Sequence, residues 1–172
     1  MAILANTEIL KEIEAGNIVI SPFTPDMVGP ASVDLRLSNV FRVYKTVRRN
    51  MPINDLSDFK VATERVEVKD FFLLIPGETV LGITMERIKL SESICGWLEG
   101  RSRFARFGLL VHISASFMQP GIDNHQVLEL SNFGPQPLEL YPGTRICQFI
   151  FERAEGKGKY KGTFQLQTPE TF

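Results

Sequence analysis

The sequence predicts a mainly β protein, a sandwich or a barrel built from many short strands. Short apolar runs in which polar residues alternate with apolar ones follow one another from Ile18 onward, and this is the pattern of strands that bury one face. Pro-Gly or Gly-Pro pairs stand between several of these runs and mark tight turns. Strands joined by turns, without helices between them, indicate a β architecture rather than a parallel α/β sheet.

One helix is predicted ahead of the strands. Ile9, Leu10 and Ile13 recur at helical spacing, which is typical of a surface helix that packs its apolar side on a sheet. Asn6 is the expected N-cap and Gly16 the expected stop. The expected strands are the segments 18–20, 33–38, 40–47, 64–68, 71–75, 79–85, 94–100, 109–117, 125–133, 137–141 and 145–153.

Composition indicates an ordinary globular protein with one domain over residues 1–172. The hydrophobic fraction is 44% and the charged fraction 23%. Lys and Arg number 19 against 20 for Asp and Glu. This balance argues against a broad nucleic-acid surface, which needs a basic excess, but it leaves room for a local basic pocket. We expect a cytoplasmic protein without a membrane partner, because no signal peptide or apolar span is evident.

The residues available for chemistry exclude several common enzyme classes. A zinc deaminase needs an H-x-E motif and a P-C-x-x-C pair, whereas Cys95 and Cys147 lie 52 positions apart and His112 and His125 stand outside such motifs. The two cysteines are expected as buried free thiols, with a disulfide as the alternative. An enzyme with this sequence would have to use carboxylates, hydroxyls and arginines.

Two segments could supply those groups. Gly100–Gly108 contains three arginines and a serine within six residues, so it is either an anion-binding turn or a solvated basic turn paired with surface acids. Glu129 shares one strand face with Val127 and Ser131, and it points either to solvent or into a pocket. In a partly dry pocket its pKa would rise, and the carboxylate could transfer protons near neutral pH.

At these two segments the sequence resembles the dCTP deaminases of the dCTP deaminase/dUTPase superfamily. GRSRFARFGLLVH (100–112) is similar to the signature G-R-S-S-[LTY]-[AG]-R-x-G with its following strand and histidine. VLELSN (127–132) matches the family block V/T-L-E-[FLI]-x-N without a gap. Further blocks match in family order at 29–44, 72–90, 138–152 and 158–162.

The resemblance implies a distorted barrel or jelly roll of the dUTPase-like (β-clip) type, with one N-terminal helix and short helical turns. It implies a homotrimer whose active sites lie between subunits, and a flexible C-terminal lid over residues 155–172. The reaction would convert dCTP to dUTP and ammonia during pyrimidine deoxynucleotide synthesis, without zinc and with Mg²⁺ held by the triphosphate. dTTP would be a candidate inhibitor.

The resemblance also assigns roles to residues. Glu129 matches the general acid/base, Ser102 and Arg106 match residues that place water and support charge, and the backbone at Ala115 matches a segment that holds the water and the amino group. The residues that match substrate-binding positions are Arg101, Ser102, Arg103, Phe104, Ala105, Arg106, Gln119, Val127, Leu128, Glu129, Lys159, Tyr160 and Thr163.

Some positions depart from the family pattern. Arg103 replaces the second serine of the signature, Thr163 replaces a glutamine in the lid, and the turn GIDNH (121–125) lacks an aromatic residue and a glycine. Gln119 stands where the family has an aspartate, and a neutral amide cannot act as a base. Gln119 therefore favours deamination over dUTPase or bifunctional activity. A non-catalytic nucleotide-binding regulator is the remaining alternative.

Overall fold

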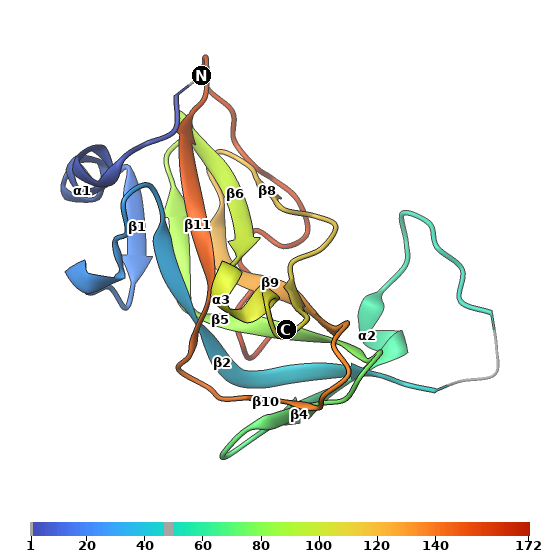
Figure 1. The fold of residues 1–172 in the computed structure, drawn as a ribbon. Coiled ribbons are helices and arrows are strands. Elements are labelled where there is room, and N and C mark those ends of the chain that lie inside the picture. Colours follow the sequence, from blue (N-terminus) through green and yellow to red (C-terminus); the bar gives the residue numbers. More distant parts are fainter. Residues whose placement is uncertain (1, 47–49) are drawn as a thin grey trace.

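A computed structural model describes residues 2–46 and 50–172. Its helical elements are short, apart from one at the N-terminus, and strands make up most of the rest (Figure 1). The helices are α1 (Asn6–Glu14), the 3₁₀ turn η1 (Pro25–Met27), α2 (Phe59–Ala62) and α3 (Ser102–Ala105). The strands are β1 (Ile18–Ser21), β2 (Val33–Tyr44), β3 (Thr63–Glu67), β4 (Phe72–Leu74), β5 (Thr79–Leu90), β6 (Ile94–Gly100), β7 (Leu109–Val111), β8 (Phe117–Met118), β9 (Asp123–Asn132), β10 (Leu138–Leu140) and β11 (Arg145–Arg153).

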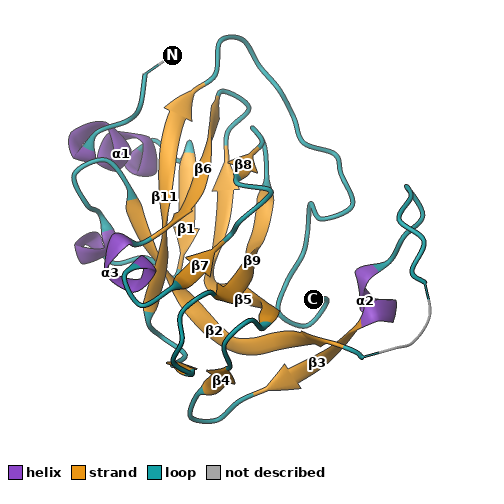
Figure 2. Ribbon diagram, turned by 45° about the vertical axis from the view of Figure 1, so that its right-hand side comes forward, coloured by secondary structure: helices purple, strands orange, loops and turns teal. Residues whose placement is uncertain are grey.

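One antiparallel sheet dominates the fold. Its strands run in the order β7-β9-β5-β2-β11-β6-β8, with β1 also paired to β5 and β3 to β2, while β4 and β10 form a separate ribbon. The pairing register shifts between Leu37 and Phe41 on β2 and between Ile83 and Arg87 on β5. Such irregularities bend strands and increase their twist, and the sheet curls around its own inner face (Figures 1 and 2). The predicted mainly β, distorted-barrel class is therefore confirmed.

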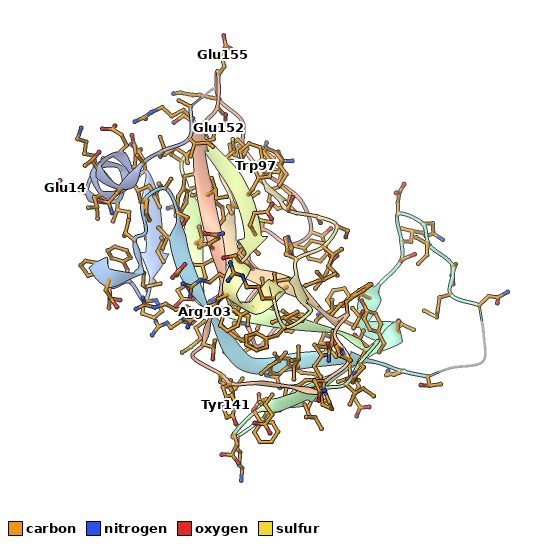
Figure 3. All side chains as sticks on the ribbon, viewed as in Figure 1. Glu14, Trp97, Arg103, Tyr141, Glu152 and Glu155 are labelled. Atoms are coloured by element: carbon orange, nitrogen blue, oxygen red, sulfur yellow. The ribbon has the colours of Figure 1, made fainter. Side chains whose placement is uncertain are left out.

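The core lies inside the curled sheet. On β2, Val33, Leu35 and Leu37 are fully buried and alternate with partly exposed residues, as the two-residue period of a strand requires. Phe149 and Phe151 of β11 stack with ring centroids 4.5 Å apart in the same core. Side chains fill this space in the stick view (Figure 3). The apolar residues whose alternation predicted the strands therefore also form the core.

Some predicted element boundaries were wrong. The segments 33–38 and 40–47 form one strand, β2, which ends at Tyr44; Val47 lies outside the described residues. The segment 109–117 divides into β7 and β8 because His112 adopts a left-handed conformation, φ 59°, which turns the chain.

The ends of α1 differ in how well they were predicted. Ala5 rather than Asn6 is the N-cap, and the Asn6 amide donates instead to the Gly29 carbonyl oxygen at 3.2 Å. Gly16, φ 73°, follows the helix end as predicted.

Both cysteines are free and buried, which confirms the thiol prediction and excludes a disulfide between them. Burial raises the pKa of the Cys147 thiol far above its ordinary value. Within residues 2–46 and 50–172, no helix has the length and apolar character needed to cross a bilayer.

Candidate active site

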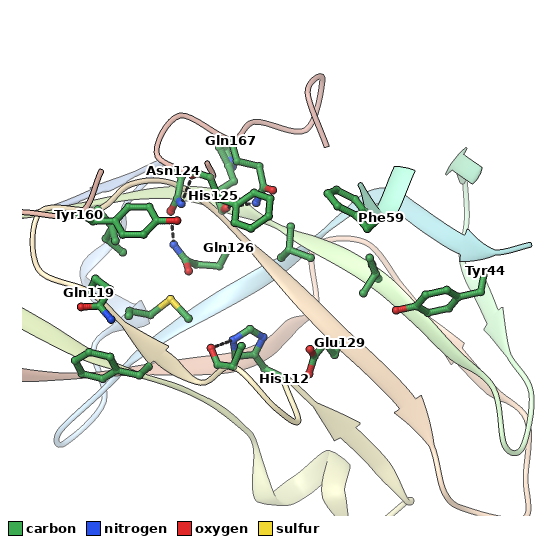
Figure 4. A pocket seen from close by; sticks show the side chains of 17 residues that line it. Tyr44, Phe59, His112, Gln119, Asn124, His125, Gln126, Glu129, Tyr160 and Gln167 are labelled. Carbon is green, nitrogen blue, oxygen red and sulfur yellow. Dashed lines mark hydrogen bonds between the residues drawn. The ribbon is translucent and has the colours of Figure 1, made fainter. Parts of the chain in front are cut away.

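A cavity of about 530 Å³ lies beside β9, between that strand, β8 and the chain segment that follows β11 (Figure 4). This volume falls in the range of sites for small ligands. Its lining combines aromatic, amide and imidazole side chains with one carboxylate. The lining residues are Tyr44, Phe59, Leu81, His112, Ala115, Phe117, Met118, Gln119, Ile122, Asn124, His125, Gln126, Val127, Glu129, Tyr160, Phe164 and Gln167.

Glu129 supplies that single carboxylate. It is held by Ser114, whose backbone N–H donates to Oε2 at 2.8 Å and whose hydroxyl donates to Oε1 at 2.7 Å. Burial acts to raise the pKa of Glu129, but the two Ser114 hydrogen bonds outweigh it and help to hold the pKa below its ordinary value. The expected raised pKa is therefore wrong for this arrangement, and the carboxylate is ionised at neutral pH.

His112 positions the loop that faces Glu129. Its backbone N–H donates to the Glu129 carbonyl oxygen at 2.7 Å, and its Nε2 lies 2.8 Å from the Ala115 carbonyl oxygen. Burial lowers the pKa of His112, so the ring is neutral at pH 7. Because a carbonyl only accepts, Nε2 carries the proton and donates to Ala115, which fixes the Ala115 backbone at the cavity.

Several other predicted residues also reach this cavity. Val127 lies on the same face of β9 as Glu129, whereas Leu128 is fully buried in the core and is not among the described residues that line the cavity. Gln119 lines the cavity and is exposed. Tyr160 lies over it, since its backbone N–H bonds to the Pro120 carbonyl oxygen at 2.9 Å.

The arginine-rich segment does not take part in the cavity of its own chain. None of residues 101–106 is among the described residues that line it. Arg101 pairs with Asp34 at 3.0 Å and donates to the Arg145 carbonyl oxygen at 2.9 Å, so one arginine of this turn is paired with an acid. Arg103, on α3, lies with its guanidinium 5.7 Å from the centroid of the Phe104 ring and is labelled in Figure 3.

Three further residues of that segment are open to solvent. Ser102, Ala105 and Arg106 are exposed, and Arg106 directly follows α3. They are free to meet a ligand or a second chain.

Two lid positions lie away from the cavity. Lys159 is exposed, with Nζ 3.8 Å from a Glu92 carboxylate oxygen. Thr163 lines a neighbouring hollow of about 420 Å³ beside α2. That residues 155–172 form a flexible lid stays a prediction.

Sequence reasoning did not find three of the residues that shape the site: Ser114, Tyr44 and Gln126. Tyr44 reaches the cavity from the end of β2, where burial and the Glu129 charge raise the pKa of its hydroxyl. The run of small residues at 114–116 inside an apolar segment was the only local sign that the chain turns there.

The described part of the chain contains no group of three or more His, Cys, Asp or Glu side chains placed to hold a metal ion. Among the residues of the described chain that line the cavity, Glu129 is the only carboxylate. At nucleotide sites Mg²⁺ keeps several waters and has few protein ligands. A Mg²⁺ ion in this cavity would therefore be bound through the oxygens of a polyphosphate and water rather than through a set of protein carboxylates.

Comparison with known proteins identifies the family. The model of the dCTP deaminase-like family matches residues 3–154. The chain belongs to the dCTP deaminase-like family. A relative from Nocardioides sp., named dCTP deaminase, dUMP-forming, is 38% identical over 98% of this chain and 93% of its own. One of the same name from Methanosphaera stadtmanae is 39% identical over 88% of this chain and 79% of its own.

The family's fold is also found among solved structures. The crystal structure of 2′-deoxycytidine 5′-triphosphate deaminase from Agrobacterium tumefaciens superposes with a TM-score of 0.69 at 20% identity. The superposition covers 89% of this chain and 48% of that longer chain. At this identity the match supports the fold of this chain.

Proposed function

We propose that this protein hydrolyses the 4-amino group of dCTP, with Glu129 as the general acid/base. One observation supports this most strongly. A single ionised carboxylate stands in a small-ligand cavity, next to a backbone carbonyl that His112 holds in place. Hydrolysis at C4 needs a base for water, a proton for the ring and an acceptor for the amino group, and this set of groups offers all three.

The proposed steps use only these groups. Glu129 takes a proton from a water molecule as its oxygen attacks C4, and then passes this proton to N3. Collapse of the tetrahedral carbon breaks the C4–N4 bond, and a second proton transfer through Glu129 releases ammonia and leaves a uracil carbonyl. The Ala115 carbonyl oxygen accepts from the amino group, and the Val127 backbone binds the pyrimidine edge. A Mg²⁺ ion on the triphosphate would neutralise phosphate charge during binding.

The position of α3 supports a site shared between subunits. Within one chain, the residues 101–106 that should bind phosphate and support charge do not line the cavity that contains Glu129. We therefore propose a homotrimer in which a neighbouring subunit supplies Ser102 and Arg106 to each cavity. This arrangement is heterologous, so three copies related by rotation would form three equivalent sites.

Mixing two inactive variants tests the shared site. Ser102→Ala and Glu129→Gln should each be inactive alone, but subunits exchanged at equal concentration should recover about a quarter of the wild-type activity, because one cavity in four combines two intact halves. Ammonia release after unfolding and refolding the mixture measures this. The matched control mixes Glu129→Gln with Glu129→Ala. No recovery in the first mixture would show that each site lies in one chain.

The protonation state of Glu129 makes a separate prediction. Ser114→Ala removes the hydroxyl hydrogen bond that lowers the pKa of Glu129, so this pKa should rise. The base is active above its pKa and is lost as pH falls through it, and the acid limb of kcat/KM should therefore move to higher pH. Ser116→Ala, at a neighbouring serine that makes no contact with Glu129, is the control. Identical acid limbs in all three proteins would contradict the role of Ser114.

Formation of dUMP is the second candidate for the overall reaction. Sequence reasoning favoured dUTP as the product because Gln119 cannot act as a base, but the relatives named dUMP-forming favour a second hydrolytic step. One assay with dCTP and Mg²⁺ separates the outcomes. One pyrophosphate released with each ammonia would identify dUMP as the product, whereas ammonia without pyrophosphate would identify dUTP. Pyrophosphate without ammonia would overturn deamination itself.

A further inference from the structure

Gln126 is a buried amide that no step of the proposed reaction uses. It lies on β9 three residues before Glu129, and only 4% of it is exposed. It lines the same cavity as Glu129. In Figure 4 its side chain extends from β9 into the space between Tyr160 and Gln119, on the far side of the cavity from Tyr44.

Hydrogen bonds determine which end of this amide is free. The Phe164 carbonyl oxygen accepts from Asn124 Nδ2 at 2.6 Å. The remaining oxygen of Asn124, Oδ1, accepts from Gln126 Nε2 at 2.6 Å. The Phe164 carbonyl can only accept, so Asn124 must turn its Nδ2 toward Phe164 and its Oδ1 toward Gln126. Gln126 must then turn its Nε2 toward Asn124. Gln126 Oε1 is left as an acceptor, and within the described residues no donor pairs with it.

A nucleotide substrate has few groups that could pair with this acceptor. Of the groups on dCTP, only the 4-amino group and the sugar 3′-hydroxyl donate hydrogen bonds, since O2, N3 and the ionised phosphates accept. The proposed function places the amino group at the Ala115 carbonyl oxygen, in the cavity that Glu129 lines. Gln126 and Glu129 are three residue steps apart along β9, about 10 Å, a length comparable with the span from the amino group across the ring to the sugar.

We propose that Gln126 is a specificity-determining residue whose Oε1 accepts a hydrogen bond from the 3′-hydroxyl of the deoxyribose. This rests on the proposed function. The chain from Phe164 through Asn124 to Gln126 holds the acceptor in place, so the segment after β11 contributes to sugar recognition without touching the sugar. An acceptor on a largely buried side chain, once the ligand has shut out water and left it without a donor, discriminates against a substrate that lacks the hydroxyl.

Comparing two substrates in two proteins tests this. The wild type should prefer dCTP over 2′,3′-dideoxy-CTP in kcat/KM by about 10- to 100-fold. In Gln126→Leu the preference should fall close to one, because dCTP loses a contact that the dideoxynucleotide never makes. Asn124→Leu should weaken the preference, because the Gln126 amide is then free to rotate.

Matched variants and a binding assay complete the design. Gln165→Leu removes another glutamine, one that donates to the Gly121 carbonyl oxygen and does not line the cavity, so it should keep the full preference. Dissociation constants of both nucleotides, measured in a Glu129→Gln background, repeat the comparison without turnover. Preferences unchanged in Gln126→Leu, or lost in Gln119→Leu instead, would overturn the assignment to Gln126. Failure of the wild type to bind or deaminate dCTP would overturn the proposed function as well.

Discussion

Glu129→Gln is expected to slow ammonia release from dCTP by about 10⁴-fold, the upper end of what general acid–base groups contribute. The loss should be this large because one carboxylate makes every proton transfer, and Glu129 is the only carboxylate among the described residues that line the cavity. The amide keeps the shape of the side chain and can still accept from Ser114. Binding of dCTP should therefore change little. Stopped assays of ammonia, together with a dissociation constant for dCTP, measure the two effects separately.

A remote carboxylate provides the control for that experiment. Glu14→Gln changes an exposed residue at the end of α1 and should leave turnover unaffected. Glu129→Asp keeps the charge but withdraws it by one methylene, so its rate should fall between those of the wild type and Glu129→Gln. Normal turnover by Glu129→Gln would contradict the mechanism, whereas loss of dCTP binding would show that Glu129 mainly holds the ligand.

The strands could be predicted because the alternation of apolar and polar residues along the sequence reflects which side chains are buried. Along β9, partly exposed and buried residues alternate from Asp123 to Leu130, as the sequence pattern indicated. The break after β7 was not predictable, because His112 lies in an apolar run with no glycine to mark a left-handed residue. What stabilises that turn is tertiary, since the His112 and Ser114 backbone groups both bond to Glu129.

The candidate site was predictable only in part, for a similar reason. Glu129 stood out through its motif, but alternation alone would equally have placed it in solvent. Ser114 lies 15 positions away and Tyr44 lies on a different strand, so their contact with the cavity depends on the turn at 112 and on strand pairing. The arginine segment and Glu129 both match positions of the same active site in the family, yet the single chain does not bring them together. The number of subunits that assemble cannot be predicted from the spacing of apolar residues.

Glu86→Ala is expected to cost about 1–3 kcal/mol of unfolding free energy, the range for leaving a buried hydrogen-bonding group without its partner. The Glu86 side chain is fully buried at the irregularity of β5. Its Oε1 accepts from Arg36 Nε at 2.6 Å, and its Oε2 accepts from the Arg36 backbone N–H at 2.8 Å. Alanine would leave a guanidinium and a backbone donor of β2 without partners, next to a new cavity. Equilibrium unfolding in urea, at one fixed protein concentration, measures the loss.

Two further variants test whether the loss of stability comes from breaking this particular pair or from removing any charge. Glu67→Ala breaks the exposed pair with Arg65, whose atoms lie 2.5 Å apart, and should cost less than about 1 kcal/mol. Replacing both Glu86 and Arg36 by leucine should recover part of the Glu86→Ala loss, because no unpaired charge remains buried. A loss from Glu86→Ala as small as that from Glu67→Ala would mean that the Glu86 carboxylate contributes little to stability, and that β2 and β5 are held together by their backbone ladder and apolar contacts instead.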